Sequence, residues 1–317
     1  MPYPRVLLYH SVVSDEAPVD AFTGKHVTAG QLSAHLDYLK SRYCFVSAAE
    51  FLAVYDGRSG RSYPRRPCLL TFDDGQYLLI KNALPVLEAH DVPCVIFLVA
   101  GTLAEGLVPW YIAADYLVRA AEGRSVRYLG KRFDCTAVGG ALDLKAAFKA
   151  RYIALDDEAE RRAALDEFAA AVGKPPPSLA DLPEDMAFLT PEQARLLSGH
   201  RLVALGSHGM SHRNLARLSE AEQEQELARS RDIVAALTGT QRMMVSYPDS
   251  SHTPATRALA ARYYEFGFAV ELGDDPRDRF AYPRACLGRM DVAGVRYWLT
   301  WRRRHVWGPL RRLLGRR

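Results

Sequence analysis

The chain has 317 residues, of which 49% are hydrophobic, so it can bury a full core as one large α/β domain or as two smaller ones. Its five cysteines are scattered, which favours reduced thiols in a cytoplasmic protein and argues against a disulfide framework. The net charge is +4, but residues 296–317 hold eight arginines and no acidic residue, so the rest of the chain is mildly acidic and does not look like a nucleic-acid-binding body.

The N-terminal part alternates apolar runs with helical patterns. Arg5–His10 is too short for the hydrophobic region of a signal peptide and is predicted to be a first strand. Capping-box patterns that begin at Thr28 and at Ser47 predict two helix starts. No apolar run is long enough to span a bilayer, so we expect a soluble, cytoplasmic protein. Further along, strands are predicted over residues 68–72 and 94–99, with a helix over residues 80–90 between them.

The C-terminal half shows the same alternation. A capping box at Ser219 predicts a helix over residues 219–237, and strands are predicted over residues 202–206, 243–247 and 266–272. Nearly continuous apolar strands separated by helices predict a parallel sheet that is covered on both faces.

Residues from about 103 to 185 interrupt this rhythm. Residues 110–121 and 142–172 are predicted to be helices, which indicates a largely helical insertion; a small second domain is the alternative. The predicted organisation is therefore one domain over residues 1–295 with this insertion, followed by a basic, aromatic tail over residues 296–317.

Polar residues follow several of the predicted strands. His10, Asp73, Asp74, His208 and the segment Tyr247-Pro248-Asp249 each come at the C-terminal end of a strand. In parallel α/β folds this edge carries the catalytic groups. The two aspartates can serve one site only if the strand ends and turns there, which Gly75 permits.

Two carboxylates and the pair His208 and His212 are ligand types that bind a divalent ion with an open position, which would make the protein a hydrolase. Each feature also has an ordinary explanation, since Asp-Asp-Gly alone is often a solvated turn and one histidine pair alone is weak evidence. Their joint placement at strand ends favours a site.

These segments resemble a known family. Thr71-Phe72-Asp73-Asp74-Gly75 resembles the first signature of the NodB-like polysaccharide deacetylases, carbohydrate esterase family 4. His208-Gly209-Met210-Ser211-His212 resembles their histidine-pair signature, with Gly209 where Ser or Thr is usual, and Ser246-Tyr247-Pro248-Asp249 resembles the Tyr-Pro form of the third. The resemblance covers roughly residues 5–290. It implies a distorted (β/α) barrel and metal-dependent removal of an acyl group from a sugar.

The resemblance also implies residue roles. Asp74, His208 and His212 would bind the metal, most suitably zinc, with nickel or cobalt as alternatives. Asp73 would be the general base, and the backbone N–H of Tyr247 would help to hold the developing oxyanion. Without the resemblance, the residues do not decide which aspartate is the ligand and which is the base.

The sequence also departs from the family. Ser250 stands where glycine is usual, and the late Leu-x-x-His signature that supplies the general acid is absent. His10 is our candidate for the acid; the alternative is that it only supports the structure around the site. Arg284 stands where many members place an arginine that orients the base, with Arg289 as the weaker alternative.

We therefore predict a metal-dependent hydrolase that removes an N-acetyl group from an amino sugar in a poly-, oligo- or lipid-linked saccharide. The alternatives are an O-acetyl esterase or a deformylase with the same site, or a degenerate barrel that binds a saccharide without catalysis. The tail of residues 296–317 predicts contact with the anionic inner face of a membrane. Its alternative is a final helix that packs on the body.

Overall fold

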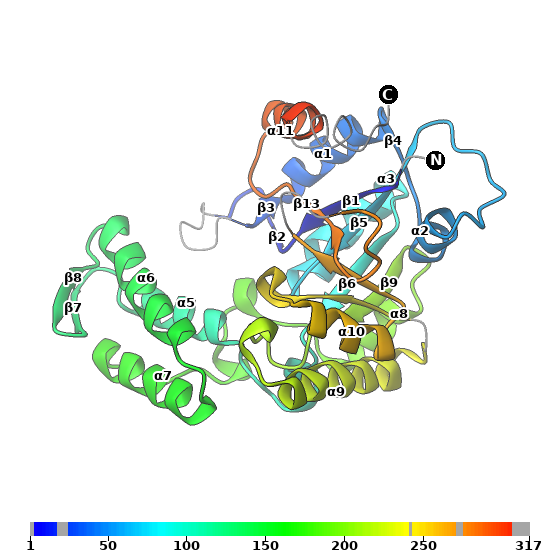
Figure 1. The fold of residues 1–317 in the computed structure, drawn as a ribbon. Coiled ribbons are helices and arrows are strands. Elements are labelled where there is room, and N and C mark those ends of the chain that lie inside the picture. The colour runs from blue at the N-terminus through cyan, green and yellow to red at the C-terminus, as the bar shows by residue number, and fades with distance from the viewer. Residues whose placement is uncertain (1–2, 18–24, 241–242, 271–274, 306–317) are drawn as a thin grey trace.

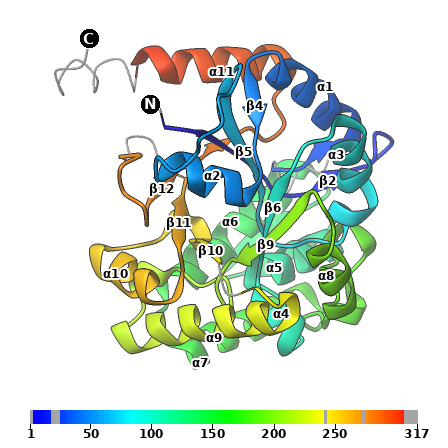
Figure 2. The same ribbon diagram turned by 90° about the vertical axis from the view of Figure 1, so that its right-hand side faces the viewer.

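A nine-stranded parallel sheet forms the centre of the molecule (Figures 1 and 2). The computed structural model describes residues 3–17, 25–240, 243–270 and 275–305. The strand order is β12-β11-β10-β9-β6-β5-β1-β13, and β4 pairs with the start of β5 outside this path. The strands are β1 (Arg5–Tyr9), β4 (Tyr43–Phe45), β5 (Arg66–Phe72), β6 (Cys94–Leu98), β9 (Val203–Ser207), β10 (Met244–Ser246), β11 (Phe266–Ala269), β12 (Tyr282–Pro283) and β13 (Ala285–Cys286).

The sheet closes on itself through one short segment. β13 pairs with β1 at one edge of the sheet, and β12 pairs with β11 at the other edge. Only Arg284 separates β12 from β13, so a single stretch of chain joins both edges. This confirms the predicted distorted (β/α) barrel, in which the C-terminal ends of the strands meet at one rim.

The strands are apolar on both faces because the barrel has an inner and an outer core. Inside, Val95, Phe97 and Phe268 pack together, and Phe51 of helix α2 (Ala48–Tyr55) contacts Phe266 and Tyr282 where β11 and β12 begin. On the outer face, alternate residues such as Leu70 and Ile96 pack under the surrounding helices. The strands therefore alternate between two apolar environments, which explains their continuous hydrophobic sequence.

Helices cover the outside of the barrel and begin where the sequence predicted. Thr28, Ser47 and Ser219 each form a complete capping box. The predicted helix over residues 80–90 differs in its first turn, which is a π-helical segment. The covering elements are α1 (Ala29–Lys40), α2 (Ala48–Tyr55), η1 (Leu79–Ala83), α3 (Leu84–His90), α8 (Pro191–Ser198), η4 (Leu215–Arg217), α9 (Glu220–Thr238), η5 (Pro248–Ser250), α10 (Pro254–Tyr263) and the small pair β2 (Val12–Val13) and β3 (Val27–Thr28).

The insertion is helical with one β-hairpin, and it has its own apolar core around Phe148 and Phe168. The single helix predicted over residues 142–172 is wrong. Leu155 is extended, and Asp157 then caps a new helix through a hydrogen bond from the Glu160 N–H. The elements are α4 (Ala100–Ala104), α5 (Trp110–Ala120), β7 (Ser125–Tyr128), β8 (Lys131–Asp134), α6 (Val138–Ala154), α7 (Glu158–Val172), η2 (Leu179–Asp181) and η3 (Glu184–Met186).

Helix α11 (Val292–His305) includes the first part of the predicted tail. Val295 and Leu299 are buried, and Trp298 packs against the outer core, which favours the alternative of a final helix on the body for this part. Residues 306–317 lie outside the described residues. Within the described ranges, none of the helices has the length and apolarity that crossing a membrane requires. All five cysteines are free thiols, as predicted.

Candidate active site

The turn after β5 brings two neighbouring carboxylates to the rim of the barrel. Asp74 and Gly75 both have left-handed backbones, with φ of 75° and 70°. These angles break the alternation of the strand, so Asp73 and Asp74 can face one site. A side chain at position 75 would also meet Leu98 Cδ2 at 2.7 Å, so the turn requires glycine.

The histidine pair lies in the loop after β9. The His208 N–H donates to the Leu98 carbonyl (2.7 Å), and its ring Nδ1 lies 2.7 Å from the Ser246 carbonyl. A carbonyl can only accept, so Nδ1 carries the proton and Nε2 is left free to bind a metal. His212 has φ of 56°, and its ring centroid lies 4.9 Å from that of His208.

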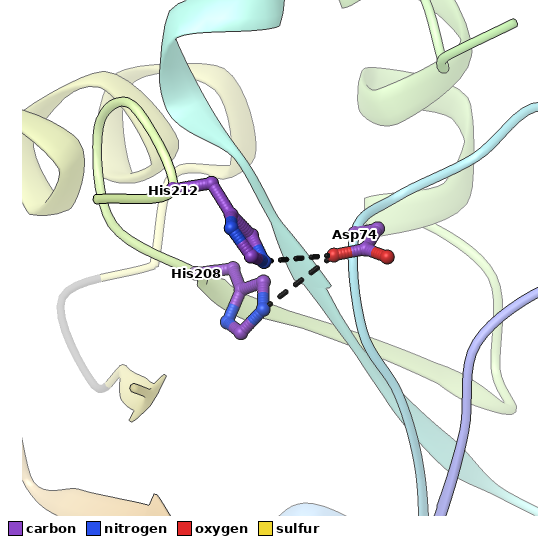
Figure 3. A group of neighbouring side chains, drawn as sticks. All are labelled: Asp74, His208 and His212. Carbon is purple, nitrogen blue, oxygen red and sulfur yellow. Dashed lines mark ion pairs between the residues drawn. The ribbon is translucent and has the colours of Figure 1, made fainter. Parts of the chain in front are cut away.

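The three predicted metal ligands converge (Figure 3). Asp74 Oδ1 lies 3.5 Å from Nε2 of His208 and 3.5 Å from Nε2 of His212. Ligands about 2.1 Å from one tetrahedral ion are about 3.4 Å apart, so this spacing suits a single ion. Asp74 Oδ1 is buried without a hydrogen-bond partner, which also fits a ligand atom. No other group of three such residues occurs within the described ranges.

The buried His212 is held in the form that binds metals. Burial, followed by the charge of His208, lowers the pKa of His212 to about 4. The imidazole is therefore neutral at neutral pH, and a neutral ring nitrogen is the one that coordinates a metal.

Asp73 forms a buried ion pair with Arg284. The Arg284 guanidinium donates to both Asp73 carboxylate oxygens at 2.7 Å, and it also donates to Ser246 Oγ (2.7 Å) and Thr71 Oγ1 (3.2 Å). Burial alone would raise the pKa of Asp73, but Arg284, and after it His208, lowers that pKa well below its usual range. Asp73 is therefore an ionised carboxylate, with its Oδ2 3.8 Å from His208 Nε2.

Arg284 occupies this position because it closes the barrel. It is 1% exposed and lies over the rings of Phe97 and Phe268, at 5.5 and 5.9 Å from their centroids. The alternative residue, Arg289, instead donates to the His26 carbonyl. The structure therefore places Arg284, and not Arg289, at the aspartate.

His10 comes directly after β1 at the same rim and is buried. Its Nδ1 has no hydrogen-bond partner among the described residues. Burial, followed by the charge of Lys25, lowers the pKa of His10 to about 3, so the imidazole is neutral at neutral pH. Tyr9 pairs with Phe72, and the Asp73 N–H donates to the Tyr9 carbonyl (3.1 Å), so His10 lies beside the two aspartates at the rim.

The predicted role of the Tyr247 N–H is wrong. That N–H donates to the Phe268 carbonyl (3.1 Å) as part of the pairing of β10 with β11, so it is not available to an oxyanion. Pro248 has no N–H, and the next backbone donor along this loop is that of Asp249, which has φ of 49°.

Tyr111 lies at the site, although no pattern in the sequence indicated it. The ring centroid of Tyr111, from α5 of the insertion, lies 4.6 Å from that of His212. Burial, followed by the charge of Asp74, raises the pKa of its hydroxyl, so Tyr111 is a neutral hydrogen-bond donor beside the carboxylate. Only the fold of the insertion brings this tyrosine to the rim.

Glu226 of α9 fixes the histidine loop from behind. Its buried carboxylate accepts hydrogen bonds from the N–H groups of Met210 (2.9 Å) and Ser211 (3.1 Å) and from the Ser211 hydroxyl. Gly209 is left-handed, with φ of 77°, a conformation that glycine adopts without strain and that serine or threonine adopts only at a cost. The family's usual residue after the first histidine is thus replaced by a glycine in a loop that a neighbouring helix holds.

Both ends of the insertion are hydrogen-bonded to the site, one to the loop after β9 that carries the histidine pair and the other to the turn after β5 that carries the two aspartates. The N–H of Ala100 donates to the Gly209 carbonyl (3.0 Å). At the other end, the N–H of Leu189 donates to the Gly75 carbonyl (3.0 Å). These backbone hydrogen bonds therefore fix the position of the insertion relative to both loops of the site.

Comparison with known proteins agrees with this geometry. A sequence model of the polysaccharide deacetylase family matches residues 145–265. The matched region includes His208, His212 and Tyr247, whereas Asp73 and Asp74 lie before it. No curated protein matches the sequence.

Several solved structures share the fold. The Streptococcus pyogenes deacetylase PplD, in complex with acetate, is 16% identical with a TM-score of 0.57, over 92% of this chain and 96% of that chain. IcaB from Ammonifex degensii is 16% identical with a TM-score of 0.56, over 94% and 95% of the two chains. The BpsB deacetylase domain from Bordetella bronchiseptica is 19% identical with a TM-score of 0.53, over 91% and 96%. At such identities the likeness shows the fold alone.

The family match, the barrel and the two motifs at its rim agree with one another. The predicted resemblance is therefore confirmed: this chain is similar to the polysaccharide deacetylase family over residues 145–265, and it shares its fold with solved deacetylase structures.

Proposed function

We propose that the protein is a metal-dependent hydrolase that removes the N-acetyl group from an amino sugar of a saccharide. The observation that carries this proposal is the convergence of Asp74, His208 and His212 beside the ionised carboxylate of Asp73. Zinc suits two imidazoles and one carboxylate, and nickel or cobalt would suit them too. A divalent ion at these three residues would polarise the acyl carbonyl and make a water molecule more acidic.

The residues of the chain then divide the proton transfers between them. Asp73 accepts the proton of the attacking water, because Arg284 keeps its carboxylate ionised and Ser246 helps to fix its orientation. His10 passes a proton to the leaving amine: the proton that Asp73 has taken from the water moves to one nitrogen of the neutral ring, and the other nitrogen releases its own proton to the amine. Tyr111 donates a hydrogen bond to the reacting group from the side of the insertion.

Loss of the ion should abolish activity. We expect that a chelator stops release of acetate from an N-acetylglucosamine oligomer and that zinc, cobalt or nickel restores it. Asp74→Ala and His212→Ala should lose both metal and activity, because each removes a ligand. The checks are metal content after dialysis and enzymatic measurement of acetate.

The same assay separates the alternatives. Formate from an N-formyl sugar, or acetate only from an O-acetyl sugar, would replace the proposed reaction with a deformylase or an esterase. A protein that holds the metal and a saccharide but hydrolyses none of these substrates would be a degenerate binding barrel. The complete set Asp73, Asp74, His208 and His212 favours a working enzyme.

Replacing His10 tests the proposed acid. His10→Asn should lower kcat on an N-acetyl sugar by about 10²–10⁴-fold, because an amine leaves only when it is protonated. Hydrolysis of an aryl acetate should fall much less, since a phenolate leaves without help. An equal loss on both substrates, with metal content retained, would show that His10 only supports the structure.

The setting of the reaction is also a proposal. A cytoplasmic enzyme would meet a lipid-linked or nucleotide-linked sugar at the inner face of the membrane. Arginines of residues 306–317, interleaved with Trp307 and leucines, would attract an anionic leaflet. The proposed partner is therefore an acetylated saccharide, and no nucleic-acid partner is proposed.

A further inference from the structure

The β7–β8 hairpin lies at the end of the insertion far from the barrel (Figure 1). Its inner face packs on the core of the insertion through Val126 and Tyr128. Its outer face and its tip belong to no core and play no part in the site described above. These surfaces carry an arrangement of residues that weakens the hairpin.

The turn at the tip places a leucine where leucine is unfavourable. Leu129 and Gly130 connect the paired residues Tyr128 and Lys131, and both turn residues have positive φ, 48° and 73°. This is a type I′ turn, in which asparagine followed by glycine is strongly preferred. Leu129 is nevertheless 42% exposed and makes no core contact that would offset the strain.

The outer face of the hairpin is also unfavourable, because it brings positively charged side chains together. Arg127 and Arg132 are direct cross-strand partners, and both are exposed. Like charges in this position repel each other. Neither Arg127 nor Lys131 forms an ion pair with any residue in the part of the chain that the structure describes. The next acidic residue, Asp134, lies at the other end of the hairpin.

Apolar side chains continue next to the hairpin. Helix α6 follows β8 and contacts it, and Val138 and Leu142, one helical turn apart, are 56% and 39% exposed. Leu129 is thus an exposed leucine at a protruding tip, beside Arg127 and Lys131, which have no ion pair within the described residues, and Arg132, which donates to the Ser125 hydroxyl (3.1 Å). This arrangement is complementary to a surface that is anionic outside and apolar beneath.

We propose that the tip residue Leu129, together with Arg127, Lys131 and Arg132, docks the insertion on an anionic lipid membrane. The arginines and the lysine would meet lipid headgroups, and Leu129 would enter the boundary with the acyl chains. An acidic polymer would satisfy the charges but would leave the strained leucine without a role. The contact is independent of the proposed reaction and of residues 306–317.

The test uses the full chain and vesicles that contain phosphatidylglycerol in phosphatidylcholine, at low salt, with binding measured by co-sedimentation. Leu129→Asn should weaken binding about tenfold or more, because it removes the inserted side chain. The same substitution should leave the unfolding temperature equal or higher, since asparagine suits this turn. Leu196→Asn is the matched control, because Leu196 is 77% exposed on α8, outside the insertion.

The charges are tested in the same way. Arg127→Gln should weaken binding about fivefold without loss of stability, because it removes one headgroup contact and one repulsion. Arg162→Gln is its control, since Arg162 is exposed on α7 of the same insertion. Binding should disappear on pure phosphatidylcholine and decrease with added salt. Release of acetate from a small soluble substrate should stay unchanged.

Three results would overturn the proposal. The first is that the full chain does not bind the anionic vesicles. The second is that Leu129→Asn and Arg127→Gln bind as tightly as the parent, with binding lost only on deletion of residues 306–317. The third is that Arg127→Gln weakens binding to heparin and to vesicles alike while Leu129→Asn weakens neither, which would identify an acidic polymer as the partner.

Discussion

Asp73→Asn should lower turnover by about 10²–10⁴-fold and leave metal binding nearly intact. The amide keeps the shape of the side chain and an oxygen that can accept from Arg284, but it cannot accept the proton of water. The loss should be in kcat, because Asp73 is not one of the three converging ligands. The measurements are kcat on an N-acetylglucosamine oligomer and the absorption spectrum of the cobalt-loaded protein.

Asp74→Ala is the comparison for this experiment. It removes Oδ1, the oxygen that faces both histidines, and should therefore lose the cobalt spectrum together with activity. If Asp73→Asn kept near-normal turnover, or lost metal as badly as Asp74→Ala, the assignment of base and ligand would be wrong.

Arg284→Met should cost about 3–5 kcal/mol of stability at neutral pH, because it leaves the buried carboxylate of Asp73 without its counter-charge. Arg284 lowers the pKa of Asp73, so the pair stabilises the folded state above the unfolded pKa of about 3.9 and loses this contribution as the pH falls. The stability difference between the parent and the variant should therefore shrink in acid. Denaturant unfolding at several pH values measures it.

The same substitution should change the pH dependence of catalysis. Without the guanidinium, burial raises the pKa of Asp73, so the acidic limb of the profile of kcat/KM should move to higher pH. Arg284→Lys keeps one positive charge but loses the two-pronged contact, so its effects should be intermediate. A variant Arg284→Met with parental stability and an unmoved acidic limb would refute the role of Arg284 in keeping the base ionised.

The sequence by itself predicted much of the site. An apolar run that ends in Asp73, Asp74 and Gly75 indicates a strand that turns at its carboxyl end, because the hydrophobic pattern defines the strand and glycine permits the turn. The capping boxes predicted helix starts correctly, because their hydrogen bonds join residues only three positions apart. The order of strands and helices was enough for a parallel fold.

Contacts between distant parts of the chain were decided only by the tertiary structure. The N–H of Tyr247 was predicted to serve the reaction, but the neighbouring strand β11 uses it, and a sequence does not show which strand pairs with which. The choice of Arg284 over Arg289 depends on the closure of the barrel between β12 and β13. Tyr111 and Glu226 reach the histidine loop from separate helices whose own sequence patterns report only burial.

Local patterns thus determined the elements and the two motifs, because their interactions span a few residues. Packing of the closed barrel determined which donors are free and which charges are paired, because those interactions join residues far apart in the chain.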